Sequence, residues 1–88
     1  MLDYKNLRVA VTGGAGLIGS FVAEELLRRG AFVIIIDDFS KGLHTNIEPV
    51  KSDIELREGN LESFAFAKVS LQDADVVFHL ASRAYGVG

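Results

Sequence analysis

A glycine-rich turn between two different apolar patterns constrains the fold of this chain more than any other feature. The turn, residues 12–19, reads Thr-Gly-Gly-Ala-Gly-Leu-Ile-Gly. It follows residues 7–12, a short run rich in β-branched side chains that is typical of a strand. It precedes residues 17–29, whose apolar side chains recur with the period of a helix. The sequence therefore predicts a strand that turns directly into a helix.

The expected helix has a defined buried side and a defined end. Ile18, Val22 and Leu26 recur every four residues and are expected to face the sheet, whereas Ser20 is expected on the polar side. Gly30 follows the last turn and supplies the C-terminal stop.

Three further segments have strand patterns. Residues 32–36 are apolar without interruption, as in a central parallel strand that helices cover on both faces. Residues 53–57 alternate, which predicts a half-exposed edge strand with its charged side chains in solvent, and residues 75–80 form a fourth strand. Residues 39–52 are rich in turn formers and are expected to be a loop in which one short helical turn can form, whereas residues 61–71 are weakly helical.

The order of these elements predicts an α/β fold of the Rossmann type, a doubly wound parallel sheet. Because crossovers between parallel strands are right-handed, the expected strand order is 3-2-1-4. The chain has 88 residues, so the sheet is expected to be truncated to about its first four strands. The topological switch then lies between the first and fourth strands, and a ligand is expected outside their carboxyl ends.

Composition excludes several classes of protein. With 49% hydrophobic residues and a net charge of −3, the chain is too apolar and too weakly charged to be disordered. It has no cysteine, which excludes a disulfide or zinc–thiolate scaffold. Its slight acidity disfavours binding to nucleic acid, and no apolar run approaches the ~20 residues that span a bilayer. No signal peptide is evident, so the expected location is the cytoplasm.

The glycine turn has the chemistry of a diphosphate site. A helix that starts in such a turn leaves its first amides unpaired, and these amides and the positive end of the helix dipole favour an anion. Gly13 suits the tight turn, Gly16 allows close approach of a pyrophosphate, and Gly19 lets the helix pack closely. The alternative is a tight turn that binds no ligand.

An acidic residue at the end of the second strand supports the first interpretation. Asp37 lies 24 residues after Gly13, where a carboxylate can accept both hydroxyls of a ribose. Because a carboxylate repels a 2′-phosphate, the sequence predicts NAD rather than NADP. The alternative for Asp37 is an exposed loop aspartate. Asp38 is expected to be such an exposed residue. Lys41 could favour a phosphate, but the adjacent Asp37 outweighs it.

Four motifs together resemble a known family. Residues 12–19 match its Thr-Gly-x-x-Gly-x-x-Gly, and residues 37–42 look like its Asp-Asn-Leu-Ser-x-Gly. Residues 58–61 are similar to its Glu-Gly-Asp-Ile/Leu and residues 75–82 to its Asp-Val-Val-Phe-His-Leu-Ala-Ala. In order and spacing, the chain resembles the extended short-chain dehydrogenase/reductases, specifically the NAD-dependent nucleotide-sugar epimerases and dehydratases, over essentially its whole length.

The resemblance implies a cofactor site to which all four motifs contribute. The second motif would hold the ribose and line the adenosine side, the third would flank adenine, and the fourth would lie along the path to the nicotinamide. The implied cofactor-binding residues are Gly13, Gly16, Leu17, Ile18, Gly19, Asp37, Asp38, Phe39, Ser40, Gly42, Asn60, Leu61, Leu80, Ala81 and Ser82.

The chain also departs from the family pattern. Asn60 stands in place of an aspartate, Asp38 in place of an asparagine, and Ser82 in place of an alanine. The family's proton-transfer pair, Tyr-x-x-x-Lys, is missing, because neither Tyr4 nor Tyr85 is followed by a lysine at that spacing. No catalytic residue is therefore assigned, and the chain alone is predicted to be inactive.

These observations give a function for a longer parent enzyme. Residues 1–88 are expected to be the N-terminal part of an NAD(P)-binding domain, without the catalytic and sugar-binding parts. The parent would take a hydride from a sugar carbon and return it, with a nucleotide sugar as its substrate. The alternative is a non-catalytic dinucleotide-binding module or an inactive truncated fragment.

The remaining expectations concern partners and histidines. The exposed edge of the fourth strand, residues 76–80, predicts a homo-oligomer. His79, at the end of that strand, is expected to be a packed or hydrogen-bonded structural histidine rather than a general base. His44 is expected to be solvated, and the two histidines do not form a metal site.

Overall fold

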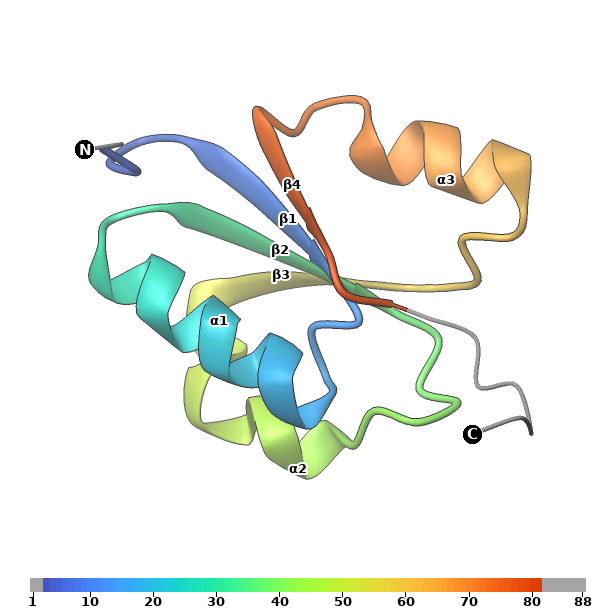
Figure 1. Cartoon of the computed structure of the whole chain (residues 1–88), viewed down its shortest axis with the longest axis horizontal. Helices are drawn as coiled ribbons and strands as arrows, with labels where there is room; N and C mark the ends of the chain where they lie inside the picture. The colour runs from blue at the N-terminus through green and yellow to red at the C-terminus, as the bar shows by residue number, and fades with distance from the viewer. Residues whose placement is uncertain (1–2, 82–88) are drawn as a thin grey trace.

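Four parallel strands form one sheet in the computed structural model, which describes residues 3–81 (Figure 1). The order across the sheet is β3-β2-β1-β4, as predicted. All three pairings are parallel, and Thr12 at the end of one central strand is in register with Ile36 on one side and His79 on the other. The strands are β1 (Arg8–Thr12), β2 (Phe32–Asp37), β3 (Ile54–Glu58) and β4 (Val76–His79).

Helices cover both faces of the sheet. On one face lie α1 (Leu17–Arg28) and the short helix α2 (His44–Ile47), and on the other lies α3 (Phe64–Leu71) (Figure 1). A 3-10 helix, Glu48–Asp53, continues directly from α2. The expectation of a loop over residues 39–52 is therefore wrong for its second half, because Ile47 and Val50 are buried in the core under α1 and hold this segment in helical turns.

Strand β2 forms the centre of the core. Its residues Val33, Ile34, Ile35 and Ile36 are at most 1% exposed, which confirms the interpretation of the uninterrupted apolar run as a central strand. Val33 and Ile35 pack in the cluster under α1, whereas Ile34 and Ile36 pack in the cluster under α3. This alternation follows from the two-residue period of a strand.

The two layers of the core differ in size. Among the described residues, ten buried residues form the cluster on the α1 side, but only Ala10, Ile34 and Ile36 form the buried cluster on the α3 side. Helix α3 leaves Phe64 and Val69 exposed. Its side of the sheet therefore has much less apolar burial to stabilise it.

Helix α1 is turned relative to the orientation that its sequence predicts. Ile18 is 71% exposed and Val22 is half-buried, whereas Ser20 is buried beside Ala23 and Leu26. The side of α1 that faces the sheet starts with small residues. The helix begins in the glycine turn and packs so closely against this turn that larger side chains do not fit there. Ser20 tolerates burial because its hydroxyl donates to the carbonyl of Leu17, at 3.1 Å.

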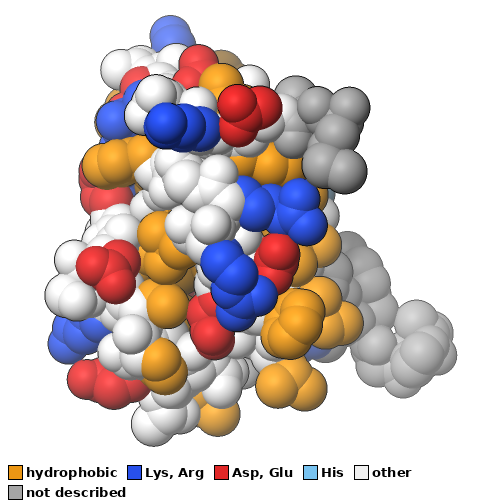
Figure 2. Space-filling model, turned by 90° about the vertical axis from the view of Figure 1, so that its left-hand side faces the viewer, with side chains coloured by type: hydrophobic (Ala, Val, Ile, Leu, Met, Phe, Trp, Pro, Cys, Tyr) orange, Lys and Arg blue, Asp and Glu red, His pale blue; other side chains and the backbone are white. Residues whose placement is uncertain are grey.

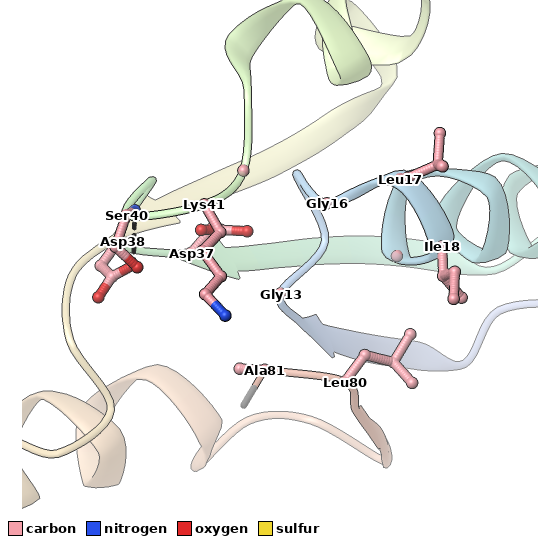
Figure 3. Close-up of a pocket in the computed structure, with 12 residues that line it drawn as sticks. Gly13, Gly16, Leu17, Ile18, Asp37, Asp38, Ser40, Lys41, Leu80 and Ala81 are labelled. Atoms are coloured by element: carbon pink, nitrogen blue, oxygen red, sulfur yellow. Dashed lines mark hydrogen bonds between the residues drawn. The ribbon is translucent and has the colours of Figure 1, made fainter. Parts of the chain in front are cut away.

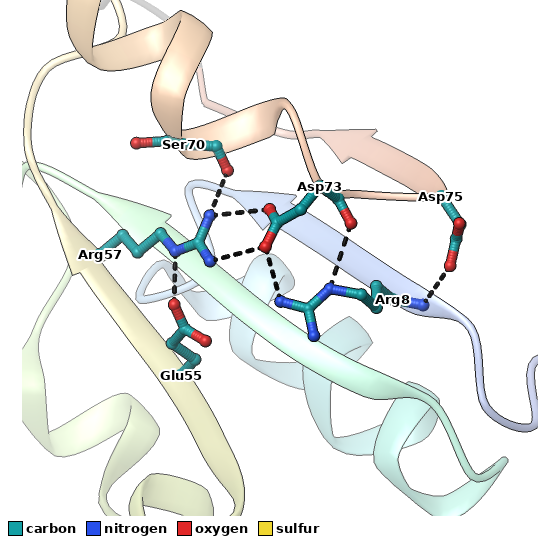
Figure 4. Close-up of polar contacts among 6 residues, drawn as sticks. All are labelled: Arg8, Glu55, Arg57, Ser70, Asp73 and Asp75. Carbon is teal, nitrogen blue, oxygen red and sulfur yellow. Dashed lines mark hydrogen bonds and ion pairs between the residues drawn. The ribbon is translucent and has the colours of Figure 1, made fainter.

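An ion-pair network joins two strands that are not neighbours (Figure 4). Arg57 on β3 and Arg8 on β1 both bind the carboxylate of Asp73, which follows α3, with N–O distances of 2.7–3.2 Å. Arg57 also binds Glu55 and donates to the carbonyl of Ser70, both at 2.6 Å. The charged side chains of β3 were expected to be solvated. Arg57 departs from this expectation, because its side chain is only 20% exposed and holds the connection between α3 and β4.

The surface at the amino ends of the strands is mixed in charge. Figure 2 shows Lys and Arg side chains interspersed with Asp and Glu on this face, with hydrophobic side chains in small groups between them. Within residues 3–81, every helix is too short or too polar to cross a lipid bilayer. The same part of the chain brings no three His, Asp or Glu side chains together as a metal site would require.

Candidate dinucleotide-binding site

A pocket of about 370 Å³ lies at the carboxyl ends of β1, β2 and β4 (Figure 3). Its volume is within the range of about 300–1,000 Å³ that is usual for small-molecule sites. It lies where the sequence places the topological switch of the sheet. The lining residues are Gly13, Gly16, Leu17, Ile18, Gly19, Asp37, Asp38, Ser40, Lys41, Gly42, Leu80 and Ala81.

The glycine turn forms one wall of this pocket. Gly13 has a φ of +71°, a conformation that favours glycine, and a Cβ atom there would lie 2.9 Å from the amide nitrogen of Ala81. A Cβ atom on Gly19 would collide with the carbonyl oxygen of Gly13, so the helix packs against the turn itself. A Cβ atom on Gly16 would meet only that same oxygen, at 3.3 Å, and the rest of its surroundings are open. The turn is therefore closed where it packs and open where a ligand would approach.

The first turn of α1 presents unpaired amides to the pocket. Gly16 is the N-cap and has no side chain to cap the helix, and the first turn contains no acidic residue. Among the described residues, the amides of Leu17, Ile18 and Gly19 have no hydrogen-bond partner. Unpaired N–H groups at the positive end of a helix dipole bind anions, so this end of the pocket suits a phosphate or diphosphate.

The carboxylate of Asp37 lies beside the glycine turn that leads into α1 and is held rigidly. It is 8% exposed, and its two oxygens accept hydrogen bonds from the amides of Ala15, at 2.9 Å, and Phe39, at 2.8 Å. A carboxylate oxygen has a second lone pair, so both oxygens remain able to accept from another donor. This geometry suits recognition of the two hydroxyls of a ribose.

The loop after β2 closes the ribose side of the pocket. Asp38 is exposed, as expected, and its Oδ1 accepts from both the amide of Ser40, at 2.9 Å, and its hydroxyl, at 2.7 Å. These bonds, the backbone one above all, lower the pKa of Asp38 below its usual value, so the carboxylate is charged at neutral pH. Gly42 is buried, and a Cβ atom there would lie 2.7 Å from the Cβ atom of Ala15 and 2.9 Å from a carboxylate oxygen of Asp37.

The end of β4 forms the third wall and is tied to β1 through one hydroxyl. Thr12 Oγ1 accepts hydrogen bonds from the amides of Leu80, at 3.0 Å, and Ala81, at 3.2 Å. The same hydroxyl forms a hydrogen bond with His79 Nδ1, at 2.7 Å. His79 has the hydrogen-bonded structural role that the sequence predicts.

Four of the expected cofactor-binding residues are not placed on the pocket wall. Phe39 stacks on His44, with ring centroids 3.8 Å apart, and packs against the core under α1. Asn60 is exposed and its Oδ1 accepts from the backbone amide two residues later, whereas Leu61 packs against the core under α3. Ser82 lies outside the described residues.

One lining residue was missed as a site residue by the sequence analysis. Lys41 lies on the wall of the pocket, although in the sequence its preference for a phosphate is outweighed by the neighbouring Asp37. Its positive charge and its position inside the motif of residues 37–42 are the sequence signals for it.

Known proteins with similar sequences are sugar-nucleotide enzymes by name. The chain is 40% identical over 75 residues to a UDP-N-acetyl-alpha-D-glucosaminuronate decarboxylase of Bacillus cytotoxicus. The aligned region covers 85% of this chain and 23% of the relative. The chain is also 40% identical over 78 residues to a UDP-glucose 4-epimerase of Corynebacterium glutamicum. That aligned region covers 89% of this chain and 23% of the relative. The chain thus spans about a quarter of the length of these relatives.

Solved structures share the fold of the chain. The epimerase Mth375 of Methanothermobacter thermautotrophicus matches 91% of this chain with a TM-score of 0.81 and 40% identity, over 24% of its own length. The enzyme WbmH of Bordetella bronchiseptica, solved in complex with NAD+, matches 91% of this chain with a TM-score of 0.80 and 32% identity, over 27% of its length.

A family model matches nearly the whole sequence of the chain. The model that describes the NAD dependent epimerase/dehydratase family matches residues 9–88, which include the glycine turn, the acidic end of β2 and strand β4. The chain belongs to the NAD-dependent epimerase/dehydratase family.

Proposed function

We propose that residues 1–88 bind NAD and are the N-terminal, cofactor-binding part of a nucleotide-sugar epimerase or dehydratase. One arrangement carries this proposal. The residues whose amides are unpaired at the start of α1 and the fixed carboxylate of Asp37 line the same pocket, and these are the groups that bind a diphosphate and a ribose. The complex of WbmH with NAD+ and the family of this chain support NAD as the ligand.

The residues of the chain fit the cofactor in three places. The amides of α1 would hold the diphosphate, Asp37 would accept from the ribose hydroxyls, and the backbone at Leu80 and Ala81 would flank the part of the cofactor beyond the diphosphate. When bound, NAD supplies hydride transfer to and from a carbon of the sugar. The chain's own contribution is to position the cofactor and to select against a 2′-phosphate.

Cofactor binding without turnover is the proposed activity of residues 1–88 by themselves. These residues contain no Tyr-x-x-x-Lys pair to move the proton that accompanies hydride transfer. The nucleotide sugar is therefore proposed as a substrate of a longer enzyme and not as a ligand of this part. A turnover assay with a nucleotide sugar and added NAD is expected to show no product with the 88-residue chain.

Calorimetric titration of the chain with NAD and then with NADP tests the binding proposal. We expect NAD to bind more tightly than NADP, and Asp37→Ala to weaken NAD binding and reduce the preference. Asp53→Ala is the matched control, because Asp53 is an exposed aspartate of the 3-10 helix and is not part of the pocket wall. A chain that is folded by circular dichroism but binds neither dinucleotide would contradict the proposal.

We also propose that the 88-residue chain self-associates through the free edge of β4. Within the described residues, β4 pairs with β1 only, and its other edge has no strand beside it. Val77 is 43% exposed and Leu80 40% exposed, so apolar side chains accompany the open backbone groups. An open apolar edge of this kind recruits a further strand.

A further inference from the structure

Lys41 extends its side chain into the pocket from the loop after β2. Figure 3 shows its amino group at the end of an extended chain that reaches toward the region between Gly13 and Ala81, away from the loop that carries it. Within residues 3–81, Lys41 makes no hydrogen bond or ion pair. It is also the only cationic side chain among the described residues of the pocket wall.

The two carboxylates nearest to Lys41 in sequence are already held by other groups. Asp37 accepts from the amides of Ala15 and Phe39, and Asp38 accepts from the amide and hydroxyl of Ser40. The ammonium group is therefore not used to neutralise either carboxylate through a direct contact. It remains available to an anion that enters the pocket.

The backbone at Lys41 is fixed on both sides. Ser40 is bonded to Asp38 before it, and the buried Gly42 packs on Ala15 and Asp37 after it. The amide of Leu43 then donates to the carbonyl of Ala15, at 3.0 Å. The loop thus presents the lysine from a defined position opposite the start of α1, so that only its side chain must be ordered on binding.

We propose that Lys41 is a phosphate-binding residue that pairs with the 5′-diphosphate of the dinucleotide from the side opposite the helix amides. This inference rests on the proposed function and adds a charged partner to a site whose other diphosphate contacts are neutral amides. The lysine reaches toward the glycine turn and not toward Asp38, so its partner is the diphosphate rather than a 2′-phosphate. A point charge of this kind tolerates small shifts of the phosphate.

Titration of the full chain with adenosine, ADP and NAD, followed by NMR chemical shifts, separates the phosphate contact from the rest of the site. We expect Lys41→Met to weaken ADP and NAD binding about fivefold at low salt, as for a solvent-accessible ion pair, and to leave adenosine binding unchanged. The difference should shrink at high salt because exposed charge pairs are screened. Lys41→Arg should retain wild-type affinity.

Lys51→Met is the matched control, because Lys51 is an exposed lysine of the 3-10 helix and is not part of the pocket wall. It should bind all three ligands as the wild type does. Equal ADP affinity of Lys41→Met and wild type would overturn the inference, as would an equal loss for adenosine. If the folded wild type binds neither ADP nor NAD, the proposed function fails and the inference falls with it.

Discussion

The carboxylate of Asp37 and the amide of Ala15 are joined by a 2.9 Å hydrogen bond, which links the end of β2 to the glycine turn after β1. The same carboxylate accepts from the amide of Phe39 at the start of the following loop. One side chain therefore orients both segments that would surround the ribose. Asp37 both holds these segments in place and is available to the ligand, so its substitution should affect both the stability of the fold and the binding of NAD.

Asp37→Asn should destabilise the fold and weaken NAD binding together. An amide group offers one acceptor oxygen in place of two, which leaves one of the two backbone donors facing an NH₂ group. A buried unsatisfied donor costs about 1–3 kcal/mol. Urea denaturation measures the stability loss and calorimetry the binding loss, and Asp53→Asn, at an exposed aspartate outside the pocket, serves as the control. Equal unfolding midpoints for Asp37→Asn and wild type would show that the two hydrogen bonds contribute nothing.

Gly19→Ala should destabilise the chain, although alanine is the better helix former by about 1 kcal/mol. The new Cβ atom would overlap the carbonyl oxygen of Gly13 and lie 2.9 Å from the Cα atom of Gly14, and these backbone atoms cannot move without opening the turn. Overpacking of this kind costs about 1–3 kcal/mol. Urea denaturation of Gly19→Ala and of Glu24→Ala, at an exposed position of the same helix, gives the comparison. A stability gain at position 19 would mean that the helix and the turn are not in close contact.

Thr12→Val should loosen Ala81 from β1, whereas Thr12→Ser should not. The backbone bond from the Leu80 amide to the Thr12 carbonyl, at 3.1 Å, remains in both variants. Valine has the shape of threonine but leaves the amide of Ala81 and the Nδ1 atom of His79 without their partner, while serine keeps the hydroxyl. We expect a loss of about 1–3 kcal/mol for valine. Amide hydrogen exchange at residue 81 provides a local measurement, and residue 80, whose amide also donates to the Thr12 carbonyl, provides the internal reference. Protection that is the same in the valine and serine variants would contradict the assignment.

Asp73 should make the stability of the chain depend on pH in the acid range. Hydrogen bonds from Arg57, with a smaller contribution from Arg8, lower the pKa of Asp73 from its usual 3.8 to about 2. Because the pKa of Asp73 is lower in the folded chain than in the unfolded chain, its contribution is complete above pH 3.8 and is lost as the pH falls toward 2. Urea midpoints measured over this range should fall less steeply in Asp73→Asn than in wild type. Asp53→Asn, at an exposed aspartate, should keep the wild-type slope.

Val77→Lys should reduce self-association of the 88-residue chain. Lysine on an edge strand opposes the addition of another strand, because a charge would have to be buried in the new interface. Light scattering at high protein concentration should give an oligomer for wild type and a smaller species for the variant. A monomeric wild type would contradict the proposed edge interface. Lys68→Ala, in helix α3, is a charge-changing control away from the edge.

The sheet and the position of the pocket could be predicted from the sequence because each depends on strong local rules. An uninterrupted apolar strand must be covered on both faces, which places residues 32–36 in the centre. Right-handed crossovers then fix the order of the other strands. The position of Asp37 at the mouth of the pocket follows from the same rules, since it ends the strand next to the glycine turn.

The details that could not be predicted depend on tertiary contacts. The orientation of α1 follows from the contact of Gly19 with the turn, and a hydrophobic period does not describe such a contact between backbones. Helix α2 is only four residues long, too short to show a period, and it is held by the bond from Asn46 Nδ2 to the carbonyl of Ala15, at 2.7 Å. The pairing of Arg57 with Asp73 joins positions that have no sequence relationship.

The contacts between Gly13, Thr12 and Ala81 have a consequence for folding. They join the first strand to the last described residue, so most of the described chain must be ordered before the pocket is complete. Bringing Thr12 and Ala81 together closes a long loop, and the conformational entropy lost in doing so is not offset by local helix formation. A dinucleotide that contacts both walls would bind only chains in which β4 has docked, and mass action would then favour the complete sheet over partly folded forms. Ligand concentration would in this way set how often the sheet opens at β4.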